Sequence, residues 1–366
     1  MSEIGERPKL WVGGEAVAEA AIRYGVTFAT GYPISPGEKT LEYFAQELPK
    51  RGGVFMHAEG ELQGINYLLG ASSGGFRCAI NSSSLGFSLM MEGISYMVQL
   101  ELPCLLINHS RGHVGNSGIG PSQADYFQMT KSGPHGGARM LVYAPSTLQE
   151  TVEMVRLGLH NGDKYRTPVV ILGDVVLAQC SELVTFPPLI EEPLPPKDWA
   201  VGDGVPKWGH GEAGPVGDPS GQGLARYEHE YRQLDAKWQR MAAVETMVEE
   251  VAMEDAEYAI VAFGTCGRIA KTVVQNARAE GVRLGLIRPQ TVWPFPEAAV
   301  AAASERVKGL LVVEMNLGQM REDVERVAQG RVPVEFFGRQ AGVVPRPDEI
   351  AEAVQQLVRG REGVVV

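Results

Sequence analysis

VTFATGYPISPGE, residues 26–38, sets an apolar run directly against a stiff turn. Its apolar part, residues 26–30, has the composition and length of a short buried strand. Pro33 and Pro36 fix their own φ and bias the preceding residues toward extended geometry, so the turn holds Ser35 in one place. Rigidity at the end of a strand indicates either a structural corner or one wall of a binding site.

Strand-like and helical patterns alternate on both sides of this stretch. In the N-terminal half, strands are predicted at 26–30, 54–57, 76–80, 104–108 and 168–172, and helices at 15–24, 37–48, 61–71, 87–98 and 147–160. In the C-terminal half, strands are predicted at 258–263, 283–287, 309–313 and 332–337, with helices between them. Such alternation favours parallel sheets covered by helices on both faces, which is an α/β fold.

Composition changes sharply between the two alternating regions, because residues 183–225 are rich in proline and glycine. We therefore predict an α/β domain over 1–182, a Pro/Gly-rich linker or excursion over 183–239, and a second α/β domain over 240–366. A GDG triplet at 202–204 resembles the start of a diphosphate-binding motif. No apolar strand or helix follows it, so we do not expect it to bind phosphate.

Charge and cysteine content exclude several classes of protein. A net charge of −11 argues against nucleic acid or an anionic membrane as the main partner. The four cysteines form no CxxC pair, which predicts buried free thiols in a reducing cytoplasm and no metal site in this chain. The sequence has no signal-peptide pattern and no run approaching the roughly 20 apolar residues of a membrane helix, so we expect a cytoplasmic protein.

Three loops combine glycine with polar side chains, and each directly follows a predicted strand. They are GYPISPGE at 31–38, NSSSLGFSLM at 81–90 and NHSRGHVGNSG at 108–118. Ligands of open α/β sheets bind in a crevice at the carboxyl edge of the strands. The three loops are therefore predicted to form a single site.

Several polar residues of these loops admit two interpretations. Arg111, flanked by glycine, could grip a carboxylate in bidentate fashion, or it could be a solvated surface arginine. Ser83 and Ser84 could cap the following helix with their side chains, or the helix could turn its first amides toward a ligand. GTCG at 264–267 could offer amides to an anion, although a tight turn without a ligand is favoured.

The roles of the histidines and glutamates near the same edge are also not decided by the sequence pattern. His57, His109 and His113 lack metal-like spacing and are interpreted as surface or turn residues. Glu59 and Glu61 stand between a strand and an apolar helix, where a carboxylate favours the helix dipole. A carboxylate facing an apolar crevice would instead have a raised pKa, which suits proton transfer.

Longer stretches in the same order along the chain resemble the alpha subunit of 2-oxoacid:ferredoxin oxidoreductases, in particular the branched-chain, 2-oxoisovalerate subfamily. They include GEAVAEAAIRYG, GYPISP, INYLLGAS, PSQADYFQMTKSGPHG, RPQTVWPFP and VVEMNLGQM. The similarity covers nearly everything outside residues 183–225. It implies an α/β fold in which a parallel-sheet thiamine-pyrimidine-type domain precedes a transketolase C-terminal-like domain.

The resemblance also implies roles for individual residues. Glu61 matches the family's catalytic glutamate, which hydrogen-bonds the aminopyrimidine ring of thiamine diphosphate. Ser35 stands where the family has a substrate-contacting threonine, and Arg111 matches the arginine that reaches the substrate carboxylate. The positions implied to contact the cofactor are Tyr32, Pro33, Ile34, Glu61, Ser84 and Leu85.

Cofactors and partners follow from the same resemblance. The family oxidatively decarboxylates a 2-oxoacid to an acyl-CoA, with coenzyme A as co-substrate, and passes the electrons to ferredoxin. A beta subunit holds the diphosphate of thiamine diphosphate and its Mg²⁺. A gamma subunit and a ferredoxin-like delta subunit complete the complex, and the iron–sulfur clusters lie on partner subunits.

Three positions, in two loops, depart from the family pattern. Leu85 replaces a proline, and the pair His113–Val114 replaces glycine and proline. An aromatic 2-oxoacid, such as a phenylglyoxylate or an arylpyruvate, is therefore an alternative substrate. A non-catalytic structural subunit of such a complex is a further alternative, although the retention of Glu61, Ser35 and Arg111 weighs against it.

Overall fold

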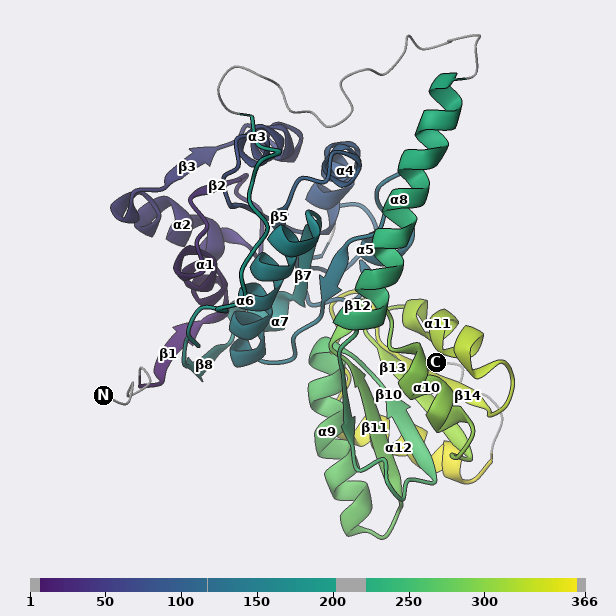
Figure 1. Cartoon of the computed structure of the whole chain (residues 1–366). Helices are drawn as coiled ribbons and strands as arrows, with labels where there is room; N and C mark the ends of the chain where they lie inside the picture. Colours follow the sequence, from purple (N-terminus) through teal and green to yellow (C-terminus); the bar gives the residue numbers. More distant parts are fainter. Residues whose placement is uncertain (1–6, 117, 202–221, 361–366) are drawn as a thin grey trace.

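The computed structural model describes residues 7–116, 118–201 and 222–360, which form two α/β units (Figure 1). The strands before residue 202 are β1 (Lys9–Val12), β2 (Phe28–Gly31), β3 (Val54–His57), β4 (Cys78–Ser82), β5 (Cys104–Ser110), β6 (Leu141–Tyr143), β7 (Pro168–Asp174) and β8 (Ser181–Val184). The helices of this part are α1 (Gly13–Arg23), α2 (Glu38–Glu47), α3 (Glu61–Ser73), α4 (Ser84–Gln99), α5 (Tyr126–Thr130), α6 (Leu148–Tyr165) and α7 (Val175–Gln179), with a 3-10 turn η1 (Pro49–Arg51).

The remaining elements follow residue 221. The strands are β9 (Val248–Val251), β10 (Tyr258–Val261), β11 (Leu284–Pro289), β12 (Thr291–Trp293), β13 (Gly309–Glu314) and β14 (Val334–Gly338). The helices are α8 (Gln222–Glu245), α9 (Gly264–Ala279), α10 (Glu297–Ser304), α11 (Gln319–Ala328) and α12 (Pro347–Val358). None of the described helices is long and apolar enough to cross a bilayer.

The first unit is built on a seven-stranded sheet with the order β12-β6-β7-β5-β4-β2-β3. All neighbouring strands are parallel except β12 and β6. Helices α1, α2 and α6 pack together on one face, and α3 and α4 pack together on the other. Every residue of β4 and β5 is buried, as expected for parallel strands covered on both faces. The predicted fold class is therefore confirmed.

The second unit has a five-stranded sheet with the order β14-β13-β10-β11-β9, parallel except at β9. Helices α9 and α12 pack against each other, as do α10 and α11. The strands predicted for this region all form, with boundaries shifted by up to two residues. The parallel strands of the sheet therefore follow from the apolar runs that the sequence displays, whereas the antiparallel edge strand β9 was not predicted.

Helix α8 begins inside the segment predicted as a linker and runs alongside the first unit (Figure 1). Its latter half buries Trp238 and Met241, which lie three residues apart on one face. Lys237 is also buried, and its ammonium group donates to the carboxylate of Glu101 at 2.8 Å. Proline and glycine upstream concealed this helix, and the GDG triplet lies outside the described residues.

Strand β12 couples the two units, because it belongs to the C-terminal half of the chain yet pairs with β6 of the first sheet. Beside it, the side chain of Arg288 is completely buried. Its guanidinium group donates to Glu150 on α6 and to Glu249 on β9. One arginine thus neutralises carboxylates from both units, and the buried charge is compensated.

Replacing Arg288 tests how strongly this ion-paired cluster holds the chain together. We expect Arg288→Ala to lower the free energy of unfolding by about 3–5 kcal/mol, because it removes a fully buried side chain and leaves the half-buried carboxylate of Glu150 without its cation. Urea unfolding followed by circular dichroism measures the change. Arg283→Ala removes an exposed arginine paired with Glu257 at the other end of β11, and we expect it to cost about 1 kcal/mol or less. Equal losses in the two variants would contradict the prediction.

Candidate functional site

The three polar loops meet at the carboxyl edge of the first sheet, as the sequence predicts. Strands β2, β4 and β5 are neighbours, and the strand order changes direction between β2 and β4. The side chain of Asn81, at the end of β4, donates to the carbonyl oxygen of Gly37 at 2.9 Å. The guanidinium group of Arg111, after β5, donates to the carbonyl oxygen of Ser35 at 2.6 Å. Hydrogen bonds therefore join the three loops directly.

The loop after β2 lies at this edge of the sheet. Tyr32 and Pro33 are exposed, whereas Ile34 and Ser35 are half-buried. The hydroxyl group of Ser35 donates to the carboxylate of Glu38, the first residue of α2. Ser35 thus ties the loop to α2 through its hydroxyl group and to Arg111 through its carbonyl oxygen, while the ring of Tyr32 stays accessible.

Glu61 is the first residue of α3, and its side chain is 5% exposed. Its carboxylate oxygen Oε1 accepts a hydrogen bond from the hydroxyl group of Ser82 at 3.1 Å. A Cβ atom placed on Gly86 would lie 2.4 Å from the same oxygen, so glycine is required there for the helices to approach. Glu61 therefore reaches the loop after β4 through Ser82.

Arg111 is 8% exposed, so the interpretation as a solvated surface arginine is wrong. Its guanidinium group also donates to the side-chain oxygen of Asn116 at 3.1 Å, and its backbone N–H donates to the hydroxyl oxygen of Ser84 at 3.0 Å. The expected side-chain cap on α4 is absent as well. Ser83 occupies the N-cap position without a capping hydrogen bond, and the side chain of Ser84 is directed toward the β5 loop.

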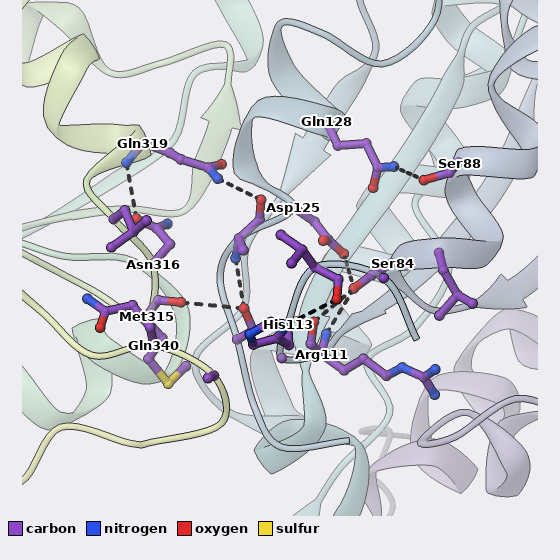
Figure 2. A pocket seen from close by; sticks show the side chains of 18 residues that line it. Ser84, Ser88, Arg111, His113, Asp125, Gln128, Met315, Asn316, Gln319 and Gln340 are labelled. Atoms are coloured by element: carbon purple, nitrogen blue, oxygen red, sulfur yellow. Dashed lines mark hydrogen bonds between the residues drawn. The ribbon is translucent and has the colours of Figure 1, made fainter. Parts of the chain in front are cut away.

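Sequence reasoning missed Asp125, although it lies in the quoted stretch PSQADYFQ. This carboxylate is buried, and it accepts a hydrogen bond from Ser84 at 2.8 Å (Figure 2). It also accepts one from Asn108 at 3.0 Å. Burial raises the pKa of Asp125, and hydrogen bonds from Ser84, Asn108 and Ser110 oppose that shift. An acidic residue beside an apolar helical run was the available signal.

A cavity of about 660 Å³ opens between this edge and the second unit (Figure 2). Its apolar lining includes Leu85, Val114 and Leu317, contributed by both units. Among the described residues that line it, Arg111 is the only arginine or lysine, and His113 lies nearby on the same loop. The cavity thus combines an apolar surface with the guanidinium group of Arg111 and the carboxyl group of Asp125.

The three histidines differ in environment. His57 and His113 are exposed, in agreement with the prediction. His109 is buried on β5, so its interpretation as a surface or turn residue is wrong. Its ring nitrogen Nε2 lies 3.2 Å from the hydroxyl oxygen of Thr40. Burial lowers the pKa of His109 to about 4, which keeps the imidazole neutral near pH 7.

The GTCG stretch opens α9 at Gly264. Gln123 covers this helix start, since its side-chain amide donates to the carbonyl oxygen of Phe263 at 2.8 Å. A Cβ atom on Gly264 would lie 3.0 Å from that amide nitrogen. The close cover by Gln123 favours the interpretation as a tight turn.

Two observations on the described residues bear on metal binding and on thiol reactivity. It contains no group of three or more His, Cys, Asp or Glu side chains arranged to hold a metal ion. All four cysteines are free, and three are buried, namely Cys78, Cys104 and Cys266. Burial raises the pKa of each of these three thiols, which disfavours the reactive thiolate.

Comparisons with known proteins agree across the chain. Residues 19–253 match the family described as pyruvate flavodoxin/ferredoxin oxidoreductase, thiamine diphosphate-binding. Residues 256–350 match the family described as pyruvate:ferredoxin oxidoreductase core domain II. The two matches meet between β9 and β10, where the second sheet takes up its parallel strands.

Two relatives come from Methanothermobacter thermautotrophicus. Its ketoisovalerate oxidoreductase subunit VorB is 35% identical, covering 94% of this chain and 96% of that protein. Its 2-oxoglutarate synthase subunit KorA is 34% identical, covering 95% and 98%. A solved 2-oxoglutarate:ferredoxin oxidoreductase from Magnetococcus marinus has the same fold, with a TM-score of 0.84 at 24% identity. That alignment covers 96% of this chain and 66% of the other, so this chain spans slightly less than two thirds of it.

The neutral, buried imidazole of His109 predicts a pH dependence of stability. Its pKa is about 4 in the folded chain and about 6.5 when unfolded, so the unfolded state binds more protons between these values. Stability is therefore lost as the pH falls from about 6.5 to 4, by roughly 3 kcal/mol from this residue. Urea unfolding of the wild type and of His109→Gln at pH 7 and pH 4 measures the difference.

We expect the wild type to lose more stability than His109→Gln over this pH range. All other titrating groups are common to both proteins and cancel in the comparison. His57→Gln removes an exposed imidazole from the same sheet and controls for the loss of a histidine as such. Parallel pH profiles for the wild type and His109→Gln would contradict the prediction.

Proposed function

The chain belongs to the 2-oxoacid:ferredoxin oxidoreductase family, and we propose that it is the alpha subunit that binds the 2-oxoacid and the pyrimidine end of thiamine diphosphate. Its relatives VorB and KorA are oxidoreductase subunits. One observation carries the proposal: buried Glu61 and buried Arg111 lie on elements that converge at one sheet edge. The reaction is the oxidative decarboxylation of a 2-oxoacid to an acyl-CoA, with electrons passed to ferredoxin.

The residues at this edge suit the pyrimidine end of the cofactor. The hydroxyl oxygen of Ser83 is buried and has no hydrogen-bond partner in the described residues, so a ligand group could form a hydrogen bond with it. Glu61 would hold a proton against a ring nitrogen, since its carboxylate is buried and fixed by Ser82. Tyr32, Pro33, Ile34, Ser84 and Leu85 would enclose the ring. When bound, thiamine diphosphate supplies the electron sink that decarboxylation needs.

Arg111 and Ser35 are proposed to bind the substrate. A guanidinium group has five N–H donors, and the two acceptors at Ser35 and Asn116 leave donors for a carboxylate. The guanidinium group is held by Ser35 and Asn116 and the backbone by Ser84, so little conformational freedom is lost when a carboxylate arrives. Burial strengthens the attraction between the two charges, because the surroundings are less polarisable than water.

The proposed substrate is a branched-chain 2-oxoacid. Its side chain is apolar, in keeping with Leu85, Val114 and Leu317 in the cavity wall. A 2-oxoacid with a second carboxylate would need a second cation, and Arg111 is the only arginine or lysine among the described lining residues. An aromatic 2-oxoacid is the alternative that the substrate comparison described below distinguishes.

A beta subunit is proposed to hold the diphosphate of the cofactor and its Mg²⁺. The described residues of this chain offer no cluster of metal ligands. Helices α3 and α4, which begin at Glu61 and Ser84, carry exposed apolar side chains that suit a protein partner. They are Leu62, Tyr67, Leu89 and Tyr96. A subunit seated on these helices would reach the same sheet edge.

Further assignments belong to the same proposal. The chain would act in the cytoplasm with a gamma subunit, a ferredoxin-like delta subunit and ferredoxin. Iron–sulfur clusters would lie on these partners, since the cysteines here are free and scattered. We propose that the chain is organised as a first domain over 1–182, a connecting segment over 183–239 and a second domain over 240–366. Helix α8 spans the boundary at 239, and β12 from the third part completes the first sheet.

Replacing Glu61 tests the catalytic assignment. We expect Glu61→Gln, in the assembled complex, to reduce 2-oxoacid-dependent reduction of ferredoxin about 100-fold or more, because the carboxamide cannot exchange a proton. Glu59→Gln changes an exposed neighbour and supplies the matched control. Purification of the complex by a tag on another subunit checks that assembly is intact.

Normal turnover in Glu61→Gln would refute the catalytic assignment, and an inactive wild-type complex would favour the non-catalytic alternative. Rates of the wild type with branched, linear, aromatic and dicarboxylic 2-oxoacids identify the substrate class. A preference for phenylglyoxylate or an arylpyruvate would replace the branched-chain assignment without changing the reaction.

A charge on α4 tests the proposed docking face. Leu89 is exposed on α4, and we expect Leu89→Asp to abolish capture of the beta subunit, because a buried carboxylate at an interface is left unpaired. Leu183→Asp places the same charge on an equally exposed leucine of β8. Co-purification from cells expressing all subunits compares the two. Loss of the beta subunit in both variants, or in neither, would contradict the proposed face.

A further inference from the structure

Asp125 stands at the centre of a buried polar network that the proposed reaction does not explain. Its side chain is 6% exposed, and the oxygen Oδ2 accepts hydrogen bonds from both Ser84 and Asn108. Ser84 is the first residue of α4, and Asn108 lies on β5. The carboxylate therefore links the start of α4 to the strand that leads to Arg111. Figure 2 shows Ser84 between the carboxylate and the backbone of Arg111.

The hydrogen bonds through Ser84 have a defined direction. A serine hydroxyl group donates one proton, and the oxygen of Ser84 lies 2.8 Å from Asp125 Oδ2 and 3.2 Å from the carbonyl oxygen of Arg111. The shorter contact, to the carboxyl oxygen of Asp125, is the stronger one. The hydroxyl oxygen is then oriented to accept the backbone N–H of Arg111 at 3.0 Å. Asp125 thus orients the hydroxyl group that binds the backbone of Arg111.

The segment that carries Asp125 is itself fixed by the second unit. Gln123 is 3% exposed, and its backbone N–H and side-chain oxygen pair with the backbone of Met315 at 3.0 Å each. Its carbonyl oxygen accepts from the side chain of Asn316 at 2.8 Å. On the other side of Asp125, the N–H of Phe127 donates to the side chain of Gln319 at 2.8 Å. Hydrogen bonds from the second unit therefore bracket Asp125.

We propose that Asp125 is a positioning residue, which sets the place of Arg111 through Ser84 and so determines how tightly the substrate carboxylate is bound. This inference rests on the proposed function, because it takes Arg111 as the carboxylate-binding group. It assigns the second unit a part in substrate binding, since loops of that unit hold the segment around Asp125. In this role Asp125, which also lines the cavity, acts through Ser84 and not through a direct bond to the substrate.

A positioning role of this kind predicts a change in KM with little change in kcat. The anchor acts on the arginine and not on Glu61, so its loss weakens binding of the ground state and the transition state alike. We expect Asp125→Ala to raise the KM for the 2-oxoacid about tenfold, the effect of one lost charge-assisted hydrogen bond. Asp125→Asn retains an oxygen that can accept from Ser84, and we expect its KM to stay within about threefold of the wild type.

The experiment measures 2-oxoacid-dependent reduction of ferredoxin by the assembled complex containing each variant. Ser84→Ala breaks the same chain of hydrogen bonds at its middle, and it covers the case in which Asp125→Ala does not assemble. We expect the double variant to have no higher KM than the worse single variant, because both act through one interaction. Asp163→Ala removes a carboxylate of similar burial that pairs with Arg77 elsewhere in the unit, and its KM should remain that of the wild type.

The outcomes separate this inference from the proposed function. An unchanged KM in Asp125→Ala, or in Ser84→Ala if the former does not assemble, would overturn the inference and leave the proposed function standing. So would additive effects in the double variant, or equal impairment of Asp125→Asn and Asp125→Ala. A wild-type complex that turns over no 2-oxoacid would overturn both.

Discussion

Burying polar groups without hydrogen-bond partners is costly, and at the carboxyl edge of the first sheet this cost draws neighbouring loops together, although the hydroxyl group of Ser83 has no partner among the described residues. Strands β4 and β5 run into the interior with polar ends, and water cannot reach all of their side chains. Partners come from neighbouring loops, so Asn81 bonds to Gly37 and Arg111 bonds to Ser35. The hydrogen bonds that pair these buried groups therefore also bring the loops of the candidate site together.

The same constraint extends to the second unit. Gln123 satisfies the backbone of Met315, and Arg288 neutralises Glu150 and Glu249 at the other end of the contact. Strand β12 adds a backbone ladder to β6. Charges, amides and strand pairing thus join the second α/β unit to the first, with the cavity between them.

Substrate preference in this family can be considered in terms of charge. VorB and KorA are almost equally similar to this chain, although their names refer to an apolar 2-oxoacid and a dicarboxylic one. Overall identity therefore does not separate the two classes. The balance of cations and apolar groups in the cavity provides a physical criterion, because an unpaired carboxylate in a partly buried cavity is costly.

The sequence by itself determined the α/β class, the strands β2, β4 and β5, and the meeting of their loops, because apolar runs of strand length alternate with helical spacing. It also identified Glu61, Ser35 and Arg111, although only as matches to a family. Tertiary structure decided the rest. Burial of Arg111 and His109, the turn of Ser84 away from its helix cap, the role of Gln123 and the pairing of β12 with β6 depend on partners far away in the chain. Local propensity carries no information about such partners, since a side chain's environment is set by whatever packs against it once the chain has folded.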